Sequence, residues 1–438
     1  MASSTTIAKG LAAALVAGVW TERALLARCE GFLGAATRAS QKKLISALLV
    51  RAYDRYPHSP ASLVRWLLRS PAFERAAAPL LRAGPKPPVV LKPPLFWPAP
   101  PLAGLDVPKL ATPRDLADWL EISVEQLDWF ACAKRQAIAL SFPKLRHYEC
   151  ALVRKRSGGS RLIEAPRRRL KAIQRRLLRE VLDHVPTSDR AYGFVRGRSC
   201  IDGAQVHAAE EVVVTLDLQR FFQSIAARRV HATFRGIGYP WAVARLLTGL
   251  CTTRAPSWGF ADVPYTEFDW RARKMLEAPH LPQGAPTSPT LANLAAWRLD
   301  RRLAGLARRL DANYTRYADD LAFSGRRNIA SPTFLRAVGE IVVDEGFVLN
   351  RPKTHIMRRG ARQEVTGIVV NEHVNLPRDA YDALKATLHN CIRNGAAVEN
   401  RDGHTDFRAH LDGRIGWAET VNPHRGARLR AMFERITW

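Results

Sequence analysis

Two adjacent carboxylates stand between two short runs of strand-forming residues in "RYADDLAFSG", residues 316–325. Two such runs joined by a tight turn predict an antiparallel hairpin. Turns of this kind usually carry Asn-Gly or Asp-Gly, because both turn residues tend to need positive φ, so Asp319 and Asp320 are a poor choice for turning the chain. Neighbouring like charges also repel, and each carboxylate has a raised pKa unless a cation lies between them. The pair therefore predicts a hairpin that binds a cation.

A third carboxylate stands at the end of another predicted strand. Residues 212–218, "VVVTLDL", are apolar and β-branched, which is typical of a buried central strand, and the strand ends in Asp217. Mg²⁺ prefers one or two protein carboxylates and leaves its other positions to water and phosphate oxygens. Two such ions about 3.5–4 Å apart would stabilise the attacking and leaving oxygens of an in-line phosphoryl transfer. The alternative for Asp319 and Asp320 is a solvated acidic turn.

The charge balance indicates a polyanionic partner. The 438 residues include 67 Lys and Arg against 40 Asp and Glu, and the formal net charge is +27. A cationic surface gains affinity for nucleic acid by releasing condensed counterions. Nucleic acid is therefore the first partner to expect and an anionic membrane surface the second. The alternative is a merely soluble basic surface, encoded by a GC-rich genome that favours Arg.

The sequence favours a cytoplasmic protein that does not enter a membrane. Its six cysteines are scattered, with no C-x-x-C and no His cluster at metal-ligand spacing, so neither a disulfide framework nor a zinc site is indicated. The apolar run at residues 10–20 is too short to span a bilayer and continues directly into polar residues. We expect it to form a buried helix, with export as the alternative.

A proline-rich stretch marks the clearest boundary in the chain. Residues 1–84 combine apolar residues at helical spacing with Arg and Lys, and predict a basic helical extension. The prolines of "GPKPPVVLKPPLFWPAPP" forbid helix and predict an extended linker over 85–104. Two short capped helices follow, and strands alternate with helices from about residue 146, which argues for an α+β fold. From 376 to 438 the pattern is helical again.

Several motifs together resemble a known family. "VVVTLDLQRFFQSI", "LPQGAPTSPTLANLAAWRLDRRL" and "RYADDLAF" resemble, in this order, the first aspartate motif, the template-grip loop and helix, and the catalytic hairpin of reverse transcriptases. "AYGFVRGRSCIDGAQVH" and "EVTGIVVN" resemble the retron branch, whose enzymes synthesise msDNA. Val365-Thr366-Gly367 matches a retron signature, whereas Gly203 departs from the Asn that usually opens the Asn-Ala-x-x-His motif, which ends here at His207. The resemblance covers roughly residues 110–438.

The resemblance implies a right-hand polymerase of the α+β class, with an antiparallel palm sheet, preceded by a small all-α N-terminal module. The N-terminal helices and fingers would take residues 105–210. The palm, with a fingers insertion, would take residues 211–375, and a helical thumb that recognises RNA would take residues 376–438. Residues 1–84 lie outside the resemblance.

The resemblance also implies which residues hold the metal ions. Asp217, Asp319 and Asp320 would be the catalytic carboxylates and would bind two Mg²⁺ ions per active site, with the Leu218 carbonyl as a further ligand. One ion would lower the pKa of the primer hydroxyl, and the other would take the charge of the pyrophosphate.

A second implied group would contact the incoming dNTP. Its members are Lys155, Arg161, Phe222, Gln283, Gly284 and Lys353. Phe222 is placed like the aromatic gate that excludes a 2′-hydroxyl; alternatively it is a core aromatic, because Phe221 is adjacent and one of the two must point inward. Lys155 and Arg161 flank a predicted Gly-Gly turn, whose alternative is a charged hairpin tip. Lys353 would protonate the leaving pyrophosphate, or it is a surface lysine.

A third implied group would bind RNA or template. Its members are Arg167, Arg168, Arg169, Lys171, Arg175, His207, Val365, Thr366 and Gly367. The basic members belong to a run that continues with Arg176 and Arg179. They spread over two turns of helix and cannot all pair with the chain's own acids, so phosphate contact is favoured over a solvated face.

These features lead to one hypothesis and two alternatives. The leading hypothesis is an RNA-directed DNA polymerase that uses a structured noncoding RNA (msr-msd) as template and primer, starts from an internal guanosine 2′-hydroxyl, and produces msDNA from dNTPs. The resemblance also suggests an effector or toxin protein as a partner in phage defence. One alternative is a group II intron-like or other bacterial reverse transcriptase. The other is a catalytically silent RNA-binding scaffold, against which the three gathered carboxylates argue.

Overall fold

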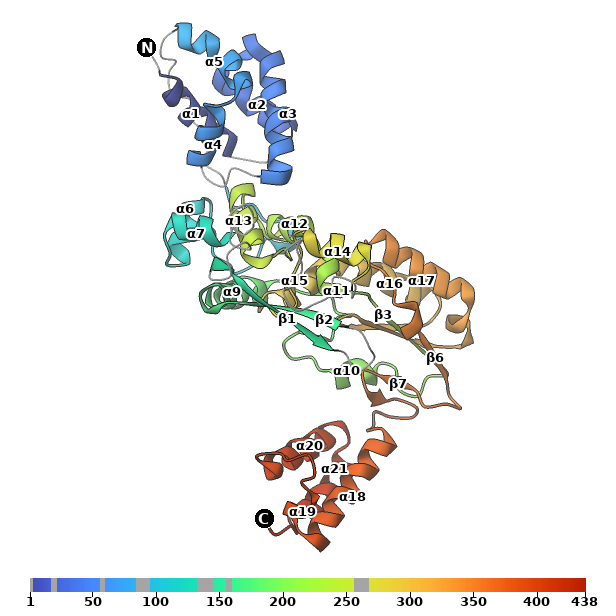
Figure 1. The fold of residues 1–438 in the computed structure, drawn as a ribbon. Coiled ribbons are helices and arrows are strands. Elements are labelled where there is room, and N and C mark those ends of the chain that lie inside the picture. The colour runs from blue at the N-terminus through green and yellow to red at the C-terminus, as the bar shows by residue number, and fades with distance from the viewer. Residues whose placement is uncertain are drawn as a thin grey trace. The chain divides into compact units, whose positions relative to one another are not determined.

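The computed structural model describes residues 3–16, 22–55, 60–83, 95–131, 145–154, 160–255 and 268–438. The chain divides into two compact units. The first unit comprises Met1–Pro186 and Phe222–Ala295, and the second comprises Thr187–Phe221 and Ala296–Trp438. Figure 1 labels most of the helices and several strands of both.

The first unit opens with a group of helices that has its own core (Figure 1). These helices are α1 (Ser4–Val16), α2 (Glu22–Leu33), α3 (Arg38–Arg55), α4 (Pro60–Leu67) and α5 (Pro71–Ala83). Apolar residues three or four positions apart share one helix face, and leucines such as Leu11, Leu44 and Leu63 lie fully buried in the core. The helix expected at residues 10–20 is α1 as far as Val16; residues 17–21 lie outside the described residues.

The predicted linker is described only from residue 95 onward. There Trp97 N donates to Gly238 O at 2.8 Å, and Ala99 N donates to Gly236 O at 2.9 Å. These two bonds fix the described end of this segment to the end of α12 (Ala227–Ile237) in the same unit.

A β-hairpin and further helices complete the first unit. Besides α12 they are α6 (Pro113–Trp119), α7 (Val124–Ala131), β1 (Tyr148–Arg154), β2 (Ser160–Pro166), α9 (Arg168–Glu180), α13 (Trp241–Cys251), α14 (Trp270–Glu277) and α15 (Ser288–Ala295). Thr112 caps α6 as expected, since its side chain accepts a hydrogen bond from Asp115 N. Strands β1 and β2 pair antiparallel from Tyr148 opposite Pro166 to Arg154 opposite Ser160.

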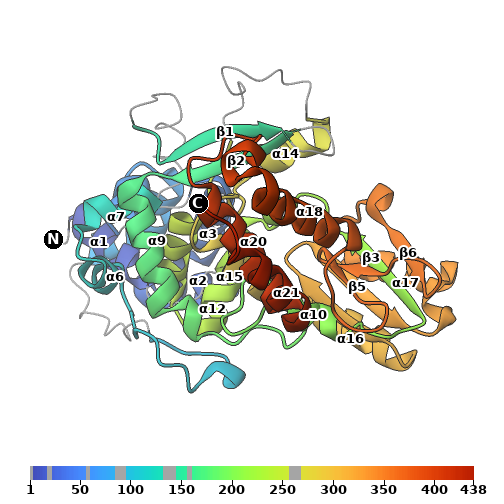
Figure 2. The ribbon, with the colours of Figure 1, turned by 90° about the horizontal axis from the view of Figure 1, so that it is seen from below.

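The second unit is built on an antiparallel sheet in the order β4-β5-β3-β6. Its strands are β3 (Val212–Asp217), β4 (Asn313–Tyr317), β5 (Asp320–Gly325) and β6 (His355–Arg358). The first three residues of β3 are fully buried, as expected of the central strand that the sequence predicts. On one face, Phe323 of β5 contacts Phe334 of α17 (Pro332–Asp344), and α16 (Trp297–Arg309) packs against β4. Figure 2 labels α16 and α17 together with β3, β5 and β6.

The last part of the second unit is helical. Its elements are α18 (Arg378–Asn394), α19 (Ala396–Glu399), α20 (Phe407–Val421) and α21 (Pro423–Phe433). As the sequence predicts, Tyr381, Leu384 and Leu388 lie on the buried face of α18, and Gly395, with φ of +90°, ends the helix. Among the residues that the structure describes, no helix is both long and apolar enough to cross a membrane.

Candidate active site

The hairpin formed by β4 and β5 turns one residue earlier than the sequence predicts. Tyr317 and Asp320 are partners in the pairing of β4 with β5, so the two turn residues are Ala318 and Asp319. Ala318 has a φ of +57°, a left-handed conformation that tight hairpin turns require. The interpretation of both carboxylates as turn residues is therefore wrong: Asp319 lies in the turn, and Asp320 is the first residue of β5.

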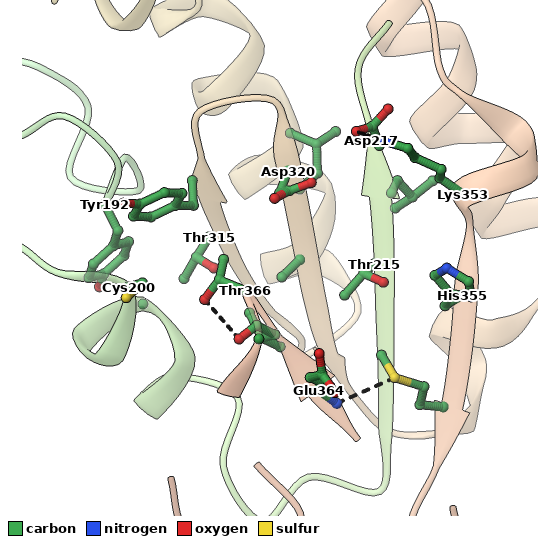
Figure 3. Close-up of a pocket in the computed structure, with 18 of the residues that line it drawn as sticks. Tyr192, Cys200, Thr215, Asp217, Thr315, Asp320, Lys353, His355, Glu364 and Thr366 are labelled. Atoms are coloured by element: carbon green, nitrogen blue, oxygen red, sulfur yellow. Dashed lines mark hydrogen bonds and ion pairs between the residues drawn. The ribbon is translucent and has the colours of Figure 1, made fainter. Parts of the chain in front are cut away.

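Strand β3 brings the third carboxylate to this hairpin. Asp217 is the partner of Asp320 in the pairing of β3 with β5, and Leu218 N donates to Asp319 O at 2.9 Å. Directly opposed residues of antiparallel strands point to the same face of the sheet. Asp217 and Asp320 thus present their carboxylates on one face, although they come from segments far apart in the sequence (Figure 3).

Two side chains from the segment after α17 hold Asp217. Asn350 Nδ2 donates to Asp217 Oδ1, and Lys353 Nζ forms an ion pair with Oδ2, each at 2.8 Å. Asp217 is only 6% exposed, so its charge needs such partners. Partial desolvation, together with repulsion from Asp319 and Asp217, raises the pKa of Asp320 to about 6. Negative charge is therefore concentrated at this hairpin.

A buried ion pair supports the turn from behind. Arg316 and Asp300 are both fully buried, and Arg316 Nε and Nη2 each donate to the Asp300 carboxylate at 2.7 Å. Tyr314 Oη also donates to Asp300, at 2.9 Å, while Arg316 Nη1 donates to Ala318 O at 3.1 Å. A Cβ at Gly193 would lie 2.7 Å from Ala318 N, so only glycine lets this segment back the turn.

A cavity of about 730 Å³ lies beside the carboxylates within the second unit. Asp217, Asp320 and Lys353 line it, and so do the residues of the predicted retron signature, Val365, Thr366 and Gly367. In Figure 3 the two carboxylates lie at the upper end of the cavity and Thr366 lies further down. The cavity thus brings two groups of predicted site residues to one surface.

The signature residues form a tight hairpin. Val365 of β7 (Glu364–Val365) is the partner of Ile368 of β8 (Ile368–Val369), so Thr366 and Gly367 are the turn residues. Their φ angles are +51° and +82°, as a turn of type I′ demands at both positions. A β-branched residue such as Thr rarely adopts positive φ, so Thr366 is held there against its preference.

His207 does not reach solvent. It is fully buried; its Nδ1 lies 2.8 Å from Ser324 Oγ, and its Nε2 lies 2.7 Å from Thr315 Oγ1. Burial lowers the pKa of His207 to about 3, so the imidazole is neutral. A direct contact of this side chain with RNA is not available in this structure; His207 instead ties its segment to strands β4 and β5.

The departure at Gly203 has a packing reason. Gly203 lies buried in α10 (Cys200–Gln205), and a Cβ there would lie 3.1 Å from Cγ of Tyr192. Any larger residue, including the usual Asn, would push against this ring. Tyr192 and Gly203 both line the cavity, so the smaller residue leaves room for an aromatic ring on the cavity wall.

The predicted nucleotide contacts that the structure describes in the first unit include Arg161, Gln283 and Gly284. Glu164 N of β2 donates to Gln283 O at 2.8 Å, and a Cβ on Gly284 would lie 3.3 Å from Ile163 Cγ2. Because side chains alternate along a strand, Arg161 shares the face of Ile163. Arg161 and Gly284 therefore lie on the same side of the hairpin. Lys155 and the predicted Gly-Gly turn lie outside the described residues.

The structure separates the two adjacent phenylalanines. Phe221 is 3% exposed and stacks on Phe347, with ring centroids 5.7 Å apart. Phe222 is half-buried. Phe221 is thus the residue that points inward, and Phe222 keeps a surface that a sugar could contact.

Comparisons with known proteins agree with this geometry. A family model described as "Reverse transcriptase (RNA-dependent DNA polymerase)" matches residues 153–379. Retron Mx65 reverse transcriptase of Myxococcus xanthus is 40% identical over 331 residues, which make up 75% of this chain and 72% of that protein. The chain belongs to the retron reverse transcriptases. Retron Mx162 reverse transcriptase of the same species is 38% identical over 346 residues (75% and 67%), and retron Ec86 reverse transcriptase of Escherichia coli is 30% identical over 320 residues (72% and 88%).

This retron reverse transcriptase is an RNA-directed DNA polymerase, and the predicted α+β, right-hand fold with an antiparallel palm sheet is confirmed. Reverse transcriptases in general use divalent metal ions, and retron enzymes work with a noncoding RNA template and dNTPs.

The side chains gathered at the hairpin of this reverse transcriptase are of the type that binds divalent ions. Their donors are carboxylate oxygens, which hard cations prefer, and the raised pKa of Asp320 shows that added positive charge would be stabilising. In the described residues, however, no three His, Cys, Asp or Glu side chains already converge into a metal site. Lys353 Nζ contacts Asp217 Oδ2, one of the oxygens that would hold an ion.

The basic run of the reverse transcriptase is only partly available to RNA. Arg176 is held by Glu121 at 2.8 Å and Glu180 at 3.2 Å, and Arg167 lies 3.4 Å from Glu149. Arg168, Arg175 and Arg179 lie on the side of α9 opposite its buried leucines, whereas Arg169 lies at the flank, with its guanidinium 6.0 Å from the centre of the Phe130 ring. The side chains of the remaining basic residues are exposed, except that of Lys171, which is half-buried: Arg168, Arg169, Lys171, Arg175 and Arg179.

Sequence reasoning missed Asn350, Tyr192 and the pair of Asp300 with Arg316. One signal was present for Asp300: it is an acid beside Leu299 on the apolar face of a helix, and Leu303 follows on that face. A charge on a buried helix face requires a partner. Nothing comparable in the sequence marks Asn350 or Tyr192.

Proposed function

We propose that this reverse transcriptase copies part of a structured noncoding RNA into msDNA, starting from an internal guanosine 2′-hydroxyl, as part of antiphage defence. The observation that carries the proposal is that one cavity is lined both by Asp217 and Asp320 and by the retron-signature turn at Thr366 and Gly367. A polymerase site alone would need only the carboxylates. The signature turn at the same surface supports an RNA that is held next to the point of synthesis.

The chemistry would be nucleotidyl transfer with two Mg²⁺ ions. Asp217, Asp319 and Asp320, with the Leu218 carbonyl, would hold the ions, which lower the pKa of the primer hydroxyl and neutralise charge on the pyrophosphate. Leu218 follows Asp217 directly and its N–H is bonded to the turn at Asp319, so the strand end and the turn are kept together.

Other residues would bind and select the nucleotide. Arg161 would contact the triphosphate from the fingers hairpin, together with Lys155, and Gln283 and Gly284 would contact the nucleotide and template base. Phe222 would exclude the 2′-hydroxyl, which its half-buried position supports. Lys353, 51% exposed beside Asp217, would serve the leaving pyrophosphate.

Arginines on the exposed face of α9 would hold the template backbone. Arg168, Arg175 and Arg179 recur at spacings of seven and four residues, so they share one helix face. The helical segment 376–438 would act as the thumb that recognises RNA. We also propose that the protein works with an effector protein and acts in the cytoplasm.

The test is to purify the protein after co-expression with its RNA locus and to look for a branched RNA–DNA product. We expect msDNA whose DNA is joined to a guanosine 2′-oxygen, and no product from Asp319→Asn. Extension only from a linear primer would favour the group II intron-like alternative. Product from the folded Asp319→Asn enzyme would contradict the assigned chemistry.

A further inference from the structure

A second charged pair lies fully buried in the first unit. Glu164 is 0% exposed and His280 is 1% exposed. His280 Nε2 lies 3.0 Å from Glu164 Oε2 and 3.2 Å from Oε1, so one N–H faces both carboxylate oxygens. Neither side chain reaches the solvent, and neither can touch a nucleotide.

The hydrogen bonds of His280 fix one of its protons. Its Nδ1 lies 2.7 Å from Ala278 O, and a carbonyl only accepts, so Nδ1 donates. Nε2 and the Glu164 carboxylate face each other across one proton, and with the carboxylate ionised Nε2 donates as well and the ring is an imidazolium. Desolvation alone would lower the pKa of His280, but attraction to Glu164 and the hydrogen bonds reverse this and raise it. The pair is therefore a buried ion pair.

Backbone hydrogen bonds anchor the segment that carries His280. Thr253 and His280 exchange two hydrogen bonds of 3.0 Å. On either side of His280, Ala227 N donates to Pro279 O at 2.9 Å, and Leu281 N donates to Ile225 O at 3.1 Å. The loop that leads to Gln283 thus starts from a fixed point.

Strand β2 meets this loop twice. Glu164 reaches His280 with its side chain, and its backbone N–H donates to Gln283 O at 2.8 Å. One residue of the fingers hairpin therefore holds both ends of the segment 280–283. Arg161 lies three residues earlier on the same strand, roughly 10 Å away at 3.3 Å per residue.

We propose that Glu164 and His280 are a positioning pair that joins the β1–β2 hairpin to the Gln283 loop and thereby sets the affinity for the incoming dNTP. The inference rests on the proposed nucleotide contacts of Arg161 and Gln283. Both contacts bind one nucleotide, so they must keep a fixed spacing, and the pair sits at the junction of the two segments that carry them. A misplacement of about 1 Å at such a site can cost about 100-fold.

The experiment measures steady-state KM for dNTP and kcat on an RNA template with an annealed DNA primer, which does not depend on the retron's own RNA. Glu164→Gln should raise KM for dNTP about 10-fold or more and change kcat far less. A double variant, Glu164→Met with His280→Leu, removes both charges while keeping similar volume, so it should melt closer to the parent than the single variant does. Its KM should remain raised, because the link is gone.

Two further variants separate the explanations. Trp119→Phe removes the hydrogen bond from Trp119 Nε1 to Glu180 (3.1 Å) in the same unit and is the control for general destabilisation; its KM should equal that of the parent. Gln283→Ala tests the proposed contact itself and should raise KM. If Gln283→Ala raises KM and the folded double variant does not, the positioning pair is refuted and the contact stands. If Gln283→Ala leaves KM unchanged, the proposed contact is refuted together with the inference, while branched-product synthesis remains a separate measurement.

Discussion

Replacing Asp300 by Asn should destabilise the unit that carries the catalytic hairpin. Asp300 accepts two hydrogen bonds of 2.7 Å from Arg316 and one of 2.9 Å from Tyr314, and both members of the ion pair are fully buried. Asn keeps the shape but leaves the guanidinium charge without a counter-charge. Breaking one side of a buried pair in this way costs about 3–5 kcal/mol. At about 2–4 °C per kcal/mol for a unit of this size, the melting temperature should fall by about 6–20 °C.

The pair also has a local effect that stability alone does not capture. Arg316 Nη1 donates to Ala318 O at 3.1 Å, so the same side chain restrains the turn between Tyr317 and Asp320. A double variant, Asp300→Leu with Arg316→Met, removes both charges and should recover much of the lost melting temperature. Primer extension per folded molecule should still be reduced, because the turn has lost its restraint.

Thermal unfolding followed by circular dichroism measures the first effect, and primer extension at a temperature where all variants are folded measures the second. The reasoning is refuted if Asp300→Asn melts within 1 °C of the parent, or if the folded double variant extends primers at the parental rate. The first result would mean that the buried charge has found another partner. The second would mean that the turn does not need Arg316.

Phe222→Ala should admit ribonucleotides, measured as the ratio of kcat/KM for dNTP over rNTP; an unchanged ratio would remove Phe222 from the site. Gly203→Asn should cost about 1–3 kcal/mol by crowding Tyr192, and Tyr192→Ala in the same chain should relieve that loss; no relief would mean that the ring is not what the new side chain meets. His207 is buried with a pKa of about 3 against its ordinary 6.5, so its contribution to stability is complete above pH 6.5 and is lost as the pH falls toward 3. The free energy of unfolding, measured with denaturant between pH 6.5 and pH 3, should decrease as the pH falls. In His207→Asn this decrease should be smaller, because the contribution of His207 is absent.

Patterns among neighbouring residues were enough to predict the strand that carries Asp217 and the buried face of a C-terminal helix. The apolar run ending in Asp217 is strand β3, and the spacing of Tyr381, Leu384 and Leu388 predicted the buried face of α18. Asp217, Asp319 and Asp320 could be assigned to one cation site, because neighbouring carboxylates repel each other unless a cation lies between them. These inferences needed only neighbouring residues and a general rule about charge.

Contacts between distant segments escaped prediction. The turn residue Ala318 has positive φ, which the identity of alanine does not announce; the cause is its surroundings, including the space left at Gly193. His207 looked like an RNA contact because its motif was read without the two hydroxyls, Ser324 and Thr315, that face it from the sheet. Such partners lie more than a hundred residues away in the chain, and spacing cannot reveal them.

In the proposed chemistry, the contact of Lys353 with Asp217 would connect metal binding to the fate of the leaving group. Its ammonium occupies Asp217 Oδ2 at 2.8 Å, and the same oxygen would be a metal ligand in the proposed chemistry. A divalent cation on the same oxygen would weaken the ion pair with lysine, because the two positive charges would repel at that distance. Coordination would therefore favour release of Lys353, whose side chain is half-exposed, while the hydrogen bond from Asn350 to Oδ1 would hold the carboxylate in place. The lysine would then become available for the pyrophosphate only in the state in which nucleotide addition can occur.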